Sequence, residues 1–211
     1  MSSLRDLYMS KTLVPDLNSF ELRTKMLALL IAVGTLASCT RATIVGHADI
    51  GVCPNITEKY DFDPVPYLGR WYETQRFSAL FEDGQDCVNA IYEDMGDGYV
   101  KVHNMGRSAS GELMEIIGKA HLIAPGVLSV EFPGHGAGDY HVLDTDYETF
   151  SCVYSCGQVG PLRVEYAWLL TRNVIVDEAL VERANQVFTK NGIDVSNFQP
   201  THQGDDCPYA V

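Results

Sequence analysis

The chain has 211 residues, of which 46% are hydrophobic and 20% are charged, and its formal net charge is −13. This length accommodates one well-buried domain plus a removable segment, and it is too short for two ordinary domains. The composition excludes a disordered or fibrous chain, and the negative charge makes nucleic acid and anionic membrane surfaces poor partners, so we expect no nucleic-acid partner.

The first predicted element is a signal peptide. Residues 26–37 form an uncharged, mostly apolar run that follows two basic residues. The run is too short to cross a bilayer, which takes about 20 residues, and we expect no transmembrane segment elsewhere. We therefore predict a signal peptide and N-terminal extension over 1–48, cleavage that leaves a mature chain beginning between residues 38 and 49, and a folded domain over 49–211.

The same region allows a second interpretation. Leu36-Ala37-Ser38-Cys39 matches a bacterial lipobox, in which the cysteine becomes an N-terminal lipid anchor. A lipid-anchored bacterial outer-membrane protein is therefore an alternative to a secreted one.

The cysteines indicate disulfides in an exported chain. There are six, at positions 39, 53, 87, 152, 156 and 207. None forms a Cys-x-x-Cys pair and no histidine stands at ligand spacing beside them, so we expect no metal site and no cofactor. If cleavage removes Cys39, five cysteines remain and one thiol is unpaired.

A glycosylation signal follows the second cysteine. Asn55-Ile56-Thr57 is an acceptor sequence for an N-linked glycan. It has this meaning only in a eukaryotic secretory pathway, and it predicts a glycan on Asn55 of a secreted, extracellular protein.

Eight strands separated by turn signals are predicted next along the chain. Their expected ranges are 70–78, 88–95, 99–106, 112–122, 127–132, 139–145, 149–156 and 164–172. In the third of them Val100, Val102 and Asn104 share one face, while Lys101 and His103 share the other. Consecutive antiparallel strands of this number favour an all-β fold, an eight-stranded up-and-down barrel whose interior has room for one small ligand.

One helix is predicted after the strands. Asp177 can cap its N-terminus, and Gly192 can end it. Its apolar positions follow helical spacing, at Leu180, Ala184, Val187 and Phe188. A single amphipathic helix needs one apolar surface, so we expect it to pack outside the barrel.

Three ordered segments resemble the conserved blocks of the lipocalin family, and in more detail its apolipoprotein D and insect bilin-binding type. They are Phe62-Asp63-Pro64-Val65-Pro66-Tyr67-Leu68-Gly69-Arg70-Trp71-Tyr72-Glu73, Thr145-Asp146-Tyr147 and Trp168-Leu169-Leu170-Thr171-Arg172. The resemblance extends over about residues 52 to 208 and implies a barrel that carries a small hydrophobic ligand.

The resemblance also implies structural roles. Trp71 would plug one end of the barrel beneath the Arg172 guanidinium, and Gly69 would leave room for the entering chain. The Thr145-Asp146-Tyr147 block would form a turn between strands. Disulfides are implied between Cys53 and Cys156 and between Cys87 and Cys207. Cys152 departs from the family pattern, and we expect a buried, inert thiol there, with a covalent tether to a ligand or partner as the alternative.

The ligand-binding residues implied by the resemblance coincide in part with the inward positions that strand alternation predicts. They are Tyr92, Asn104, Tyr140, Trp168 and Leu170. Their aromatic rings offer flat apolar walls, and the amide and phenols can bind a carbonyl, hydroxyl or carboxyl group. The alternative is that these side chains simply fill a closed core.

We therefore expect a secreted carrier, monomeric or weakly oligomeric, for a lipid, sterol, retinoid, carotenoid or bilin. A pigment-binding oligomer is the alternative that exposed Phe77, Phe81 and Phe198 would suit. We expect no enzymatic activity, because no cysteine falls on the inner face of the second or third strand and His103 alternates to the outside.

Overall fold

The structure is a computed structural model that describes residues 46–209. The predicted signal run, the cleavage window up to residue 45 and Cys39 lie outside the described residues. Within 46–209, no helix combines the length and the apolar character needed to cross a membrane.

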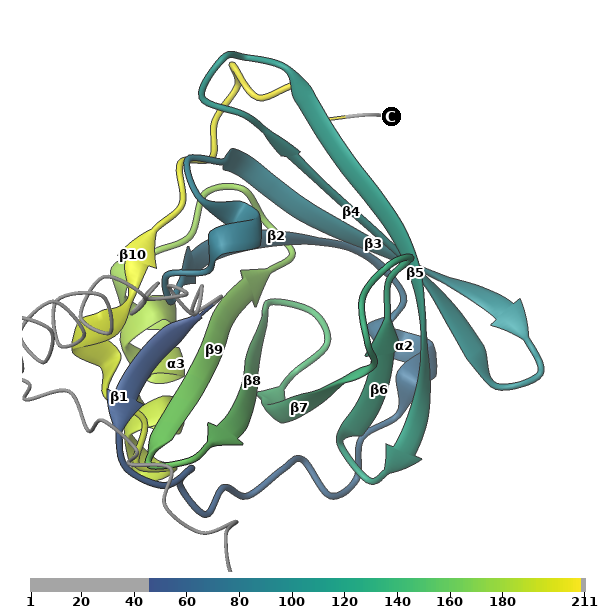
Figure 1. The fold of residues 1–211 in the computed structure, drawn as a ribbon. Helices are drawn as coiled ribbons and strands as arrows, with labels where there is room; N and C mark the ends of the chain where they lie inside the picture. Colours follow the sequence, from purple (N-terminus) through teal and green to yellow (C-terminus); the bar gives the residue numbers. More distant parts are fainter. Residues whose placement is uncertain (1–45, 210–211) are drawn as a thin grey trace, which may run out of the picture. The chain divides into compact units, whose positions relative to one another are not determined.

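Eight consecutive antiparallel strands form a closed barrel (Figure 1). They are β2 Gly69–Arg76, β3 Asp86–Gly96, β4 Tyr99–Arg107, β5 Leu113–Ala124, β6 Val127–Glu131, β7 Gly138–Thr145, β8 Phe150–Val159 and β9 Leu162–Thr171. Each strand pairs with the next, and β9 pairs with β2 to close the sheet. The predicted all-β barrel of eight strands is confirmed, with boundaries within three residues of those expected.

Two short strands extend this sheet beyond the barrel. β1 (His47–Ile50) pairs with β9, and β10 (Gln199–Pro200) pairs with β2. Neither was predicted, because segments of four and two residues carry too little alternation to be recognised. The first described strand thus begins two residues before residue 49.

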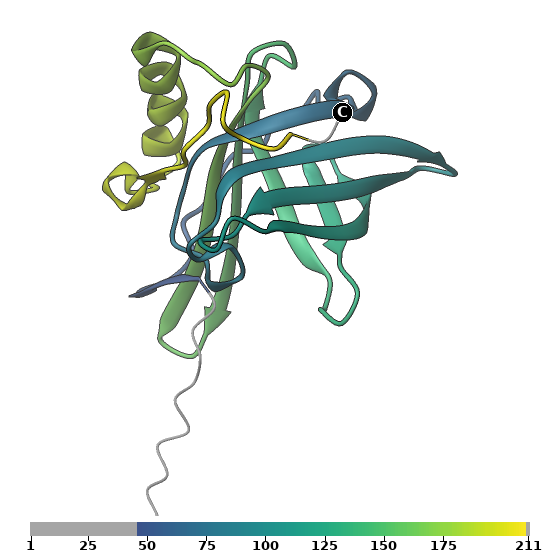
Figure 2. The ribbon, with the colours of Figure 1, turned by 90° about the horizontal axis from the view of Figure 1, so that it is seen from above.

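The expected helix is α3 (Glu178–Lys190), and it lies outside the barrel (Figure 2). The Asp177 side chain caps it by accepting a hydrogen bond from the backbone N–H of Leu180 at 2.7 Å. Ala184 and Phe188 are fully buried against the outer face of the barrel. The apolar spacing in the sequence predicted this contact correctly.

The layer beneath α3 forms a second core, separate from the barrel interior. Cys152 is fully buried in it, on the outer face of β8, and its thiol points to the carbonyl oxygen of Ala184 at 3.6 Å. Phe77 and Phe198 also belong to this layer, with ring centroids 4.7 Å apart. The expectation that both are exposed was wrong, because the C-terminal segment folds back over Phe77; Phe81 is half exposed.

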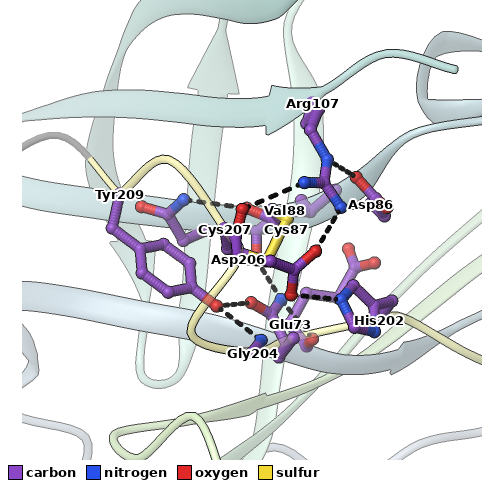
Figure 3. The surroundings of a disulfide bond; sticks show 12 residues. Glu73, Asp86, Cys87, Val88, Arg107, His202, Gly204, Asp206, Cys207 and Tyr209 are labelled. Atoms are coloured by element: carbon purple, nitrogen blue, oxygen red, sulfur yellow. Dashed lines mark hydrogen bonds and ion pairs between the residues drawn. A yellow bond between two sulfur atoms is a disulfide. The ribbon is translucent and has the colours of Figure 1, made fainter. Parts of the chain in front are cut away.

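Two disulfides fasten the ends of the described chain to the barrel, with the pairings that the resemblance implies. Cys53–Cys156 ties the N-terminal arm to β8, and Cys87–Cys207 ties the C-terminal tail to β3. Figure 3 shows Arg107 of β4 beside the second disulfide, between Asp86 and Asp206. These ion pairs hold the tail across β3 and β4.

Candidate ligand-binding site

One end of the barrel is sealed by an aromatic side chain under a guanidinium. Trp71 is fully buried, and the Arg172 guanidinium carbon lies 3.8 Å from the centroid of its ring. The short helix α2 (Pro64–Tyr67) crosses this end, and the Trp71 indole donates to the Tyr67 carbonyl oxygen at 2.8 Å. Arg172 donates hydrogen bonds of 2.7 to 3.3 Å to the carbonyl oxygens of Pro66, Tyr67, Leu68, Arg70 and Tyr147.

Gly69 and the turn that contains Asp146 allow this arrangement. Gly69 has a φ of 93°, and a Cβ there would stand 3.3 Å from the Arg172 guanidinium, so both the backbone and the space favour glycine. The Asp146 carboxylate accepts hydrogen bonds from the backbone N–H groups of residues 148–150. It also forms an ion pair with Arg183 at 2.9 Å. Thr145 accepts from the Tyr147 N–H at 2.9 Å, which completes the turn between β7 and β8.

The five predicted ligand-binding residues all lie on inward-facing positions of the barrel. Tyr92, Tyr140, Trp168 and Leu170 belong to or pack against the interior core cluster. Asn104 pairs in register with Ala90, a member of the same cluster, and so shares its face. Residues from β3, β4, β7 and β9 thus face the same barrel interior. Their contact with a ligand stays a prediction.

The interior tyrosines form a hydrogen-bonded network above Trp71. The Tyr140 hydroxyl lies 2.9 Å from the Tyr67 hydroxyl and 3.1 Å from the Tyr92 hydroxyl, and Tyr67 also reaches Ser151 at 2.9 Å. Burial raises the pKa of Tyr92 to about 12, and it raises the pKa values of Tyr67 and Tyr140 further. All three phenols are therefore neutral at physiological pH, and their hydroxyl groups already have hydrogen-bond partners in one another.

Asn104 is the interior amide that stays available. Its side chain is half-buried, and it makes no side-chain hydrogen bond to any residue of the described chain. An amide carries both donors and an acceptor, so it can bind either a carbonyl or a hydroxyl group.

A buried charged cluster that sequence reasoning missed lies on the inner face of β2, beside Leu170 and Trp168 of β9. Glu73 and Arg76 of β2 form an ion pair at 2.6 Å, and the Thr201 hydroxyl also donates to the Glu73 carboxylate. Glu82, from the short helix η1 (Leu80–Glu82) in the β2–β3 loop, accepts from the Trp168 indole at 3.2 Å. Arg76 also donates to the backbone carbonyl oxygens of Glu82 at 2.8 Å and Gln85 at 3.1 Å. Both terminal nitrogens of Arg76 therefore have hydrogen-bond partners, and its Nε lies 3.7 Å from Oε2 of Glu82.

Strand alternation was not sufficient to find this cluster. Glu73 is two residues after Trp71 and was detectable as an inward position. The register shifts between Glu73 and Gln75, so Arg76 rather than Gln75 faces the interior opposite Trp168. Glu82 belongs to a loop, where no periodicity applies.

A possible metal-binding group occurs among the described residues, outside the barrel interior. It consists of His202, Asp206 and Cys207. The Cys207 sulfur is in a disulfide and therefore offers no thiolate, and His202 and Asp206 pair with each other at 2.9 Å. This cluster serves to hold the C-terminal tail.

The burial of the inward-facing side chains changes along the barrel. Trp71, Ala120, Val142 and Val153 are fully buried. Toward the opposite end Asn104 and Trp168 are only partly buried, and Ile116, in register with Asn104, is 37% exposed. A closed eight-stranded barrel with one sealed end and a partly exposed inner wall at the other defines the class of up-and-down barrels to which ligand-binding lipocalins belong.

Comparison with known proteins gives the family. Residues 62–203 match the model of the lipocalin-like domain. The chain is 35% identical over 188 residues to apolipoprotein D of Macaca fascicularis, and 33% identical over 188 residues to that of Mus musculus; each match covers 87% of this chain and 98% of the relative. The solved structure of apocrustacyanin C1 superposes with a TM-score of 0.71 at 23% identity, covering 77% of this chain and 94% of that one. The chain belongs to the lipocalin family.

Proposed function

We propose that this protein is an extracellular carrier that holds one small hydrophobic ligand inside the barrel. The observation that carries the proposal is the change in burial along the inner wall. Side chains that face inward at the open end are only partly covered by the protein itself, although they include a large aromatic ring, that of Trp168. An apolar ligand would cover this surface.

Burial of apolar surface alone can give the barrel micromolar affinity for a ligand, without a covalent bond. Burying about 300 Å² of apolar ligand surface gains roughly 7 kcal/mol at about 25 cal/mol per Å², before the cost of association. Micromolar binding is therefore within reach, which suits a carrier because it must also release its ligand.

The charges of the interior favour an uncharged ligand. Arg76 is the inward-facing cation of β2, and its guanidinium is already paired with Glu73 and bonded to two carbonyl oxygens. A fatty-acid carboxylate would therefore find no unpaired cation on β2 among the described residues, and its burial would carry a large desolvation cost. A neutral lipid, sterol, retinoid, carotenoid or bilin fits better.

A carrier rather than an enzyme is also supported by the position of the free thiol. Cys152 lies beneath α3 and faces away from the barrel interior. Burial raises the pKa of its thiol, so a nucleophilic thiolate is disfavoured. A tether between Cys152 and an interior ligand is therefore not proposed.

Secretion is supported by the two disulfides and by the position of the glycosylation signal. Asn55 is exposed, as an acceptor for a glycan must be. Removal of the glycan with an amidase should lower the mass of protein secreted from eukaryotic cells, and Asn55→Gln should abolish that change. Protein that is retained in membranes through an acylated Cys39 would instead support the lipid-anchored alternative.

Native mass spectrometry of the secreted protein tests the carrier function. The wild-type protein should retain a small-molecule mass, and Trp168→Ala and Tyr92→Ala should lose it while circular dichroism shows an intact fold. Ile175→Ala is a matched control, because Ile175 is 85% exposed outside the barrel. Unchanged retention in both interior variants would refute the placement of the ligand.

A further inference from the structure

Glu82 stands at the open end of the barrel beside the predicted ligand wall. Its residue is only 9% exposed, although it belongs to the β2–β3 loop. Oε2 of its carboxyl group accepts the hydrogen bond of the Trp168 indole at 3.2 Å and lies 3.7 Å from Nε of Arg76. Arg76 also fixes the loop backbone through the carbonyl oxygens of Glu82 and Gln85. The position of this carboxyl group is thus set from both sides.

Half of the carboxyl group is left without a partner. Oε1 of Glu82 makes no hydrogen bond to any residue in the described part of the chain, whereas Oε2 is engaged. Oε1 is not one of the fully buried side-chain atoms without a partner in the described chain, so it keeps some accessible surface and can be reached by a ligand. Since Oε2 is bonded to an indole on the inner wall, the free oxygen is close to the space where a ligand would lie.

The surroundings of Glu82 keep its carboxyl group neutral. Burial, followed by the nearby Glu73 charge, raises the pKa of Glu82 to about 8. The charged and titratable groups around it in the described chain are Glu73 and Arg76 of β2 and Tyr92 of β3. The Arg76 charge is balanced by Glu73 at 2.6 Å, so it does not hold Glu82 in its ionised form. Near pH 7 the free oxygen can therefore carry a proton and donate a hydrogen bond.

Resting on the carrier function proposed above, we infer that Glu82 selects the polar end of the ligand, by donating a hydrogen bond to the carbonyl oxygen of an uncharged ligand. A carboxylate ligand is rejected because it would be buried beside a second carboxyl group, and the nearby cation of the described chain, Arg76, is already paired with Glu73. The ligand class is thereby narrowed to apolar molecules that end in a ketone, an aldehyde or an ester.

Three retinoids that share one hydrocarbon skeleton test this assignment. Binding of methyl retinoate, retinol and retinoic acid is measured by quenching of tryptophan fluorescence at pH 7 and pH 9.5. Glu82→Gln keeps the shape of the side chain and an N–H donor but cannot ionise. Glu112→Gln is the matched control, because Glu112 is an exposed glutamate in the loop before β5 at the same end of the barrel. Circular dichroism confirms that each variant is folded.

The wild type should bind methyl retinoate at least about tenfold more tightly than retinoic acid at pH 7, and Glu82→Gln should narrow this ratio. Between pH 7 and pH 9.5 the wild-type affinity for the ester should fall about thirtyfold, the change in the protonated fraction for a pKa of about 8. Glu82→Gln should show no such fall, and Glu112→Gln should behave as the wild type.

The results that would contradict the role of Glu82 differ from those that would contradict the carrier function. Equal wild-type affinity for ester and acid, or the same pH-dependent fall in Glu82→Gln, would overturn the role of Glu82 and leave the carrier function standing. Failure of the wild type to bind any of the three retinoids, with its fold intact, would count against the proposed function and the selection together.

Discussion

The sealed end of the barrel makes the most demanding prediction about stability. Arg172→Met keeps an unbranched apolar side chain of similar length over Trp71, and it removes the charge and every hydrogen-bond donor. The Arg172 guanidinium donates to five backbone carbonyl oxygens and lies 3.8 Å from the Trp71 ring centroid. Three of these carbonyls belong to α2 and the residue after it, so the substitution also loosens the segment that closes the barrel.

The expected loss follows from those contacts. Hydrogen bonds to a charged group contribute about 1.5 to 3 kcal/mol each, and a desolvated cation–π contact contributes about 2 kcal/mol. These contributions are not additive, and Arg172 is only partly buried, so water replaces some of the bonds. We expect Arg172→Met to lower the free energy of unfolding by about 4 kcal/mol. Arg172→Lys should lower it by about half as much, because an ammonium cannot reach several carbonyls at once.

Arg183 provides a matched control. Its guanidinium also covers an aromatic ring, that of Phe150 at 4.6 Å, but its side chain is 55% exposed and its partners are the side chains of Asp146 and Thr149. Arg183→Met should cost less than about 1 kcal/mol. Urea unfolding monitored by far-UV circular dichroism, with both disulfides intact, measures all three variants. A cost for Arg172→Met no larger than that for Arg183→Met would refute the role given to Arg172.

Three further predictions concern the rest of the fold. Cys152 is fully buried, so a thiol reagent should fail to modify it in the native protein and react once urea unfolds the chain, as peptide mass mapping would show; rapid native labelling would contradict its position under α3. The double variant Cys87→Ser/Cys207→Ser opens a loop of 120 residues and should lose about 5 kcal/mol in the chain-entropy account, and a loss below about 1 kcal/mol in urea unfolding would count against it. In the folded chain the pKa of Glu82 is about 8, whereas the pKa of a glutamate in an unfolded chain is about 4.3. Between these pH values the folded state binds more protons than the unfolded state, so the free energy of unfolding falls as pH rises. Glu82→Gln should weaken that decline between pH 5 and pH 8, and an unchanged pH profile would refute the buried position of this carboxyl group.

Much of the barrel was predictable because its strands are long and one face of each is buried. Alternation in β4 and β9 placed Val102 and Trp168 inside, and the closed register agrees with that phase. The helix was equally clear, because Asp177 and Gly192 mark its two ends. Where local pattern and global fold agree in this way, sequence reasoning succeeds.

The remaining features depend on contacts that local pattern does not encode. The pairing of Cys87 with Cys207 came from family resemblance, since the spacing of cysteines leaves several pairings open. Arg76 turns inward because of one irregularity in the register of β2, and Phe77 is buried by a segment more than a hundred residues away. Glu82 acquires its environment from a loop that contacts β2 and β9 only in the folded chain.

The central claim is that the partly exposed inner wall of the barrel binds a ligand, and photo-crosslinking tests it most directly. A long-chain methyl ester that bears a diazirine would be photolysed on the secreted protein, and the adducts would be located by peptide mass spectrometry. The claim predicts one saturable adduct per chain on inward-facing positions of β9, β3 or β4, at or beside Trp168, Tyr92 or Asn104. Adducts confined to the outer face, such as α3 or the outward positions of β5, or labelling that does not saturate, would contradict it.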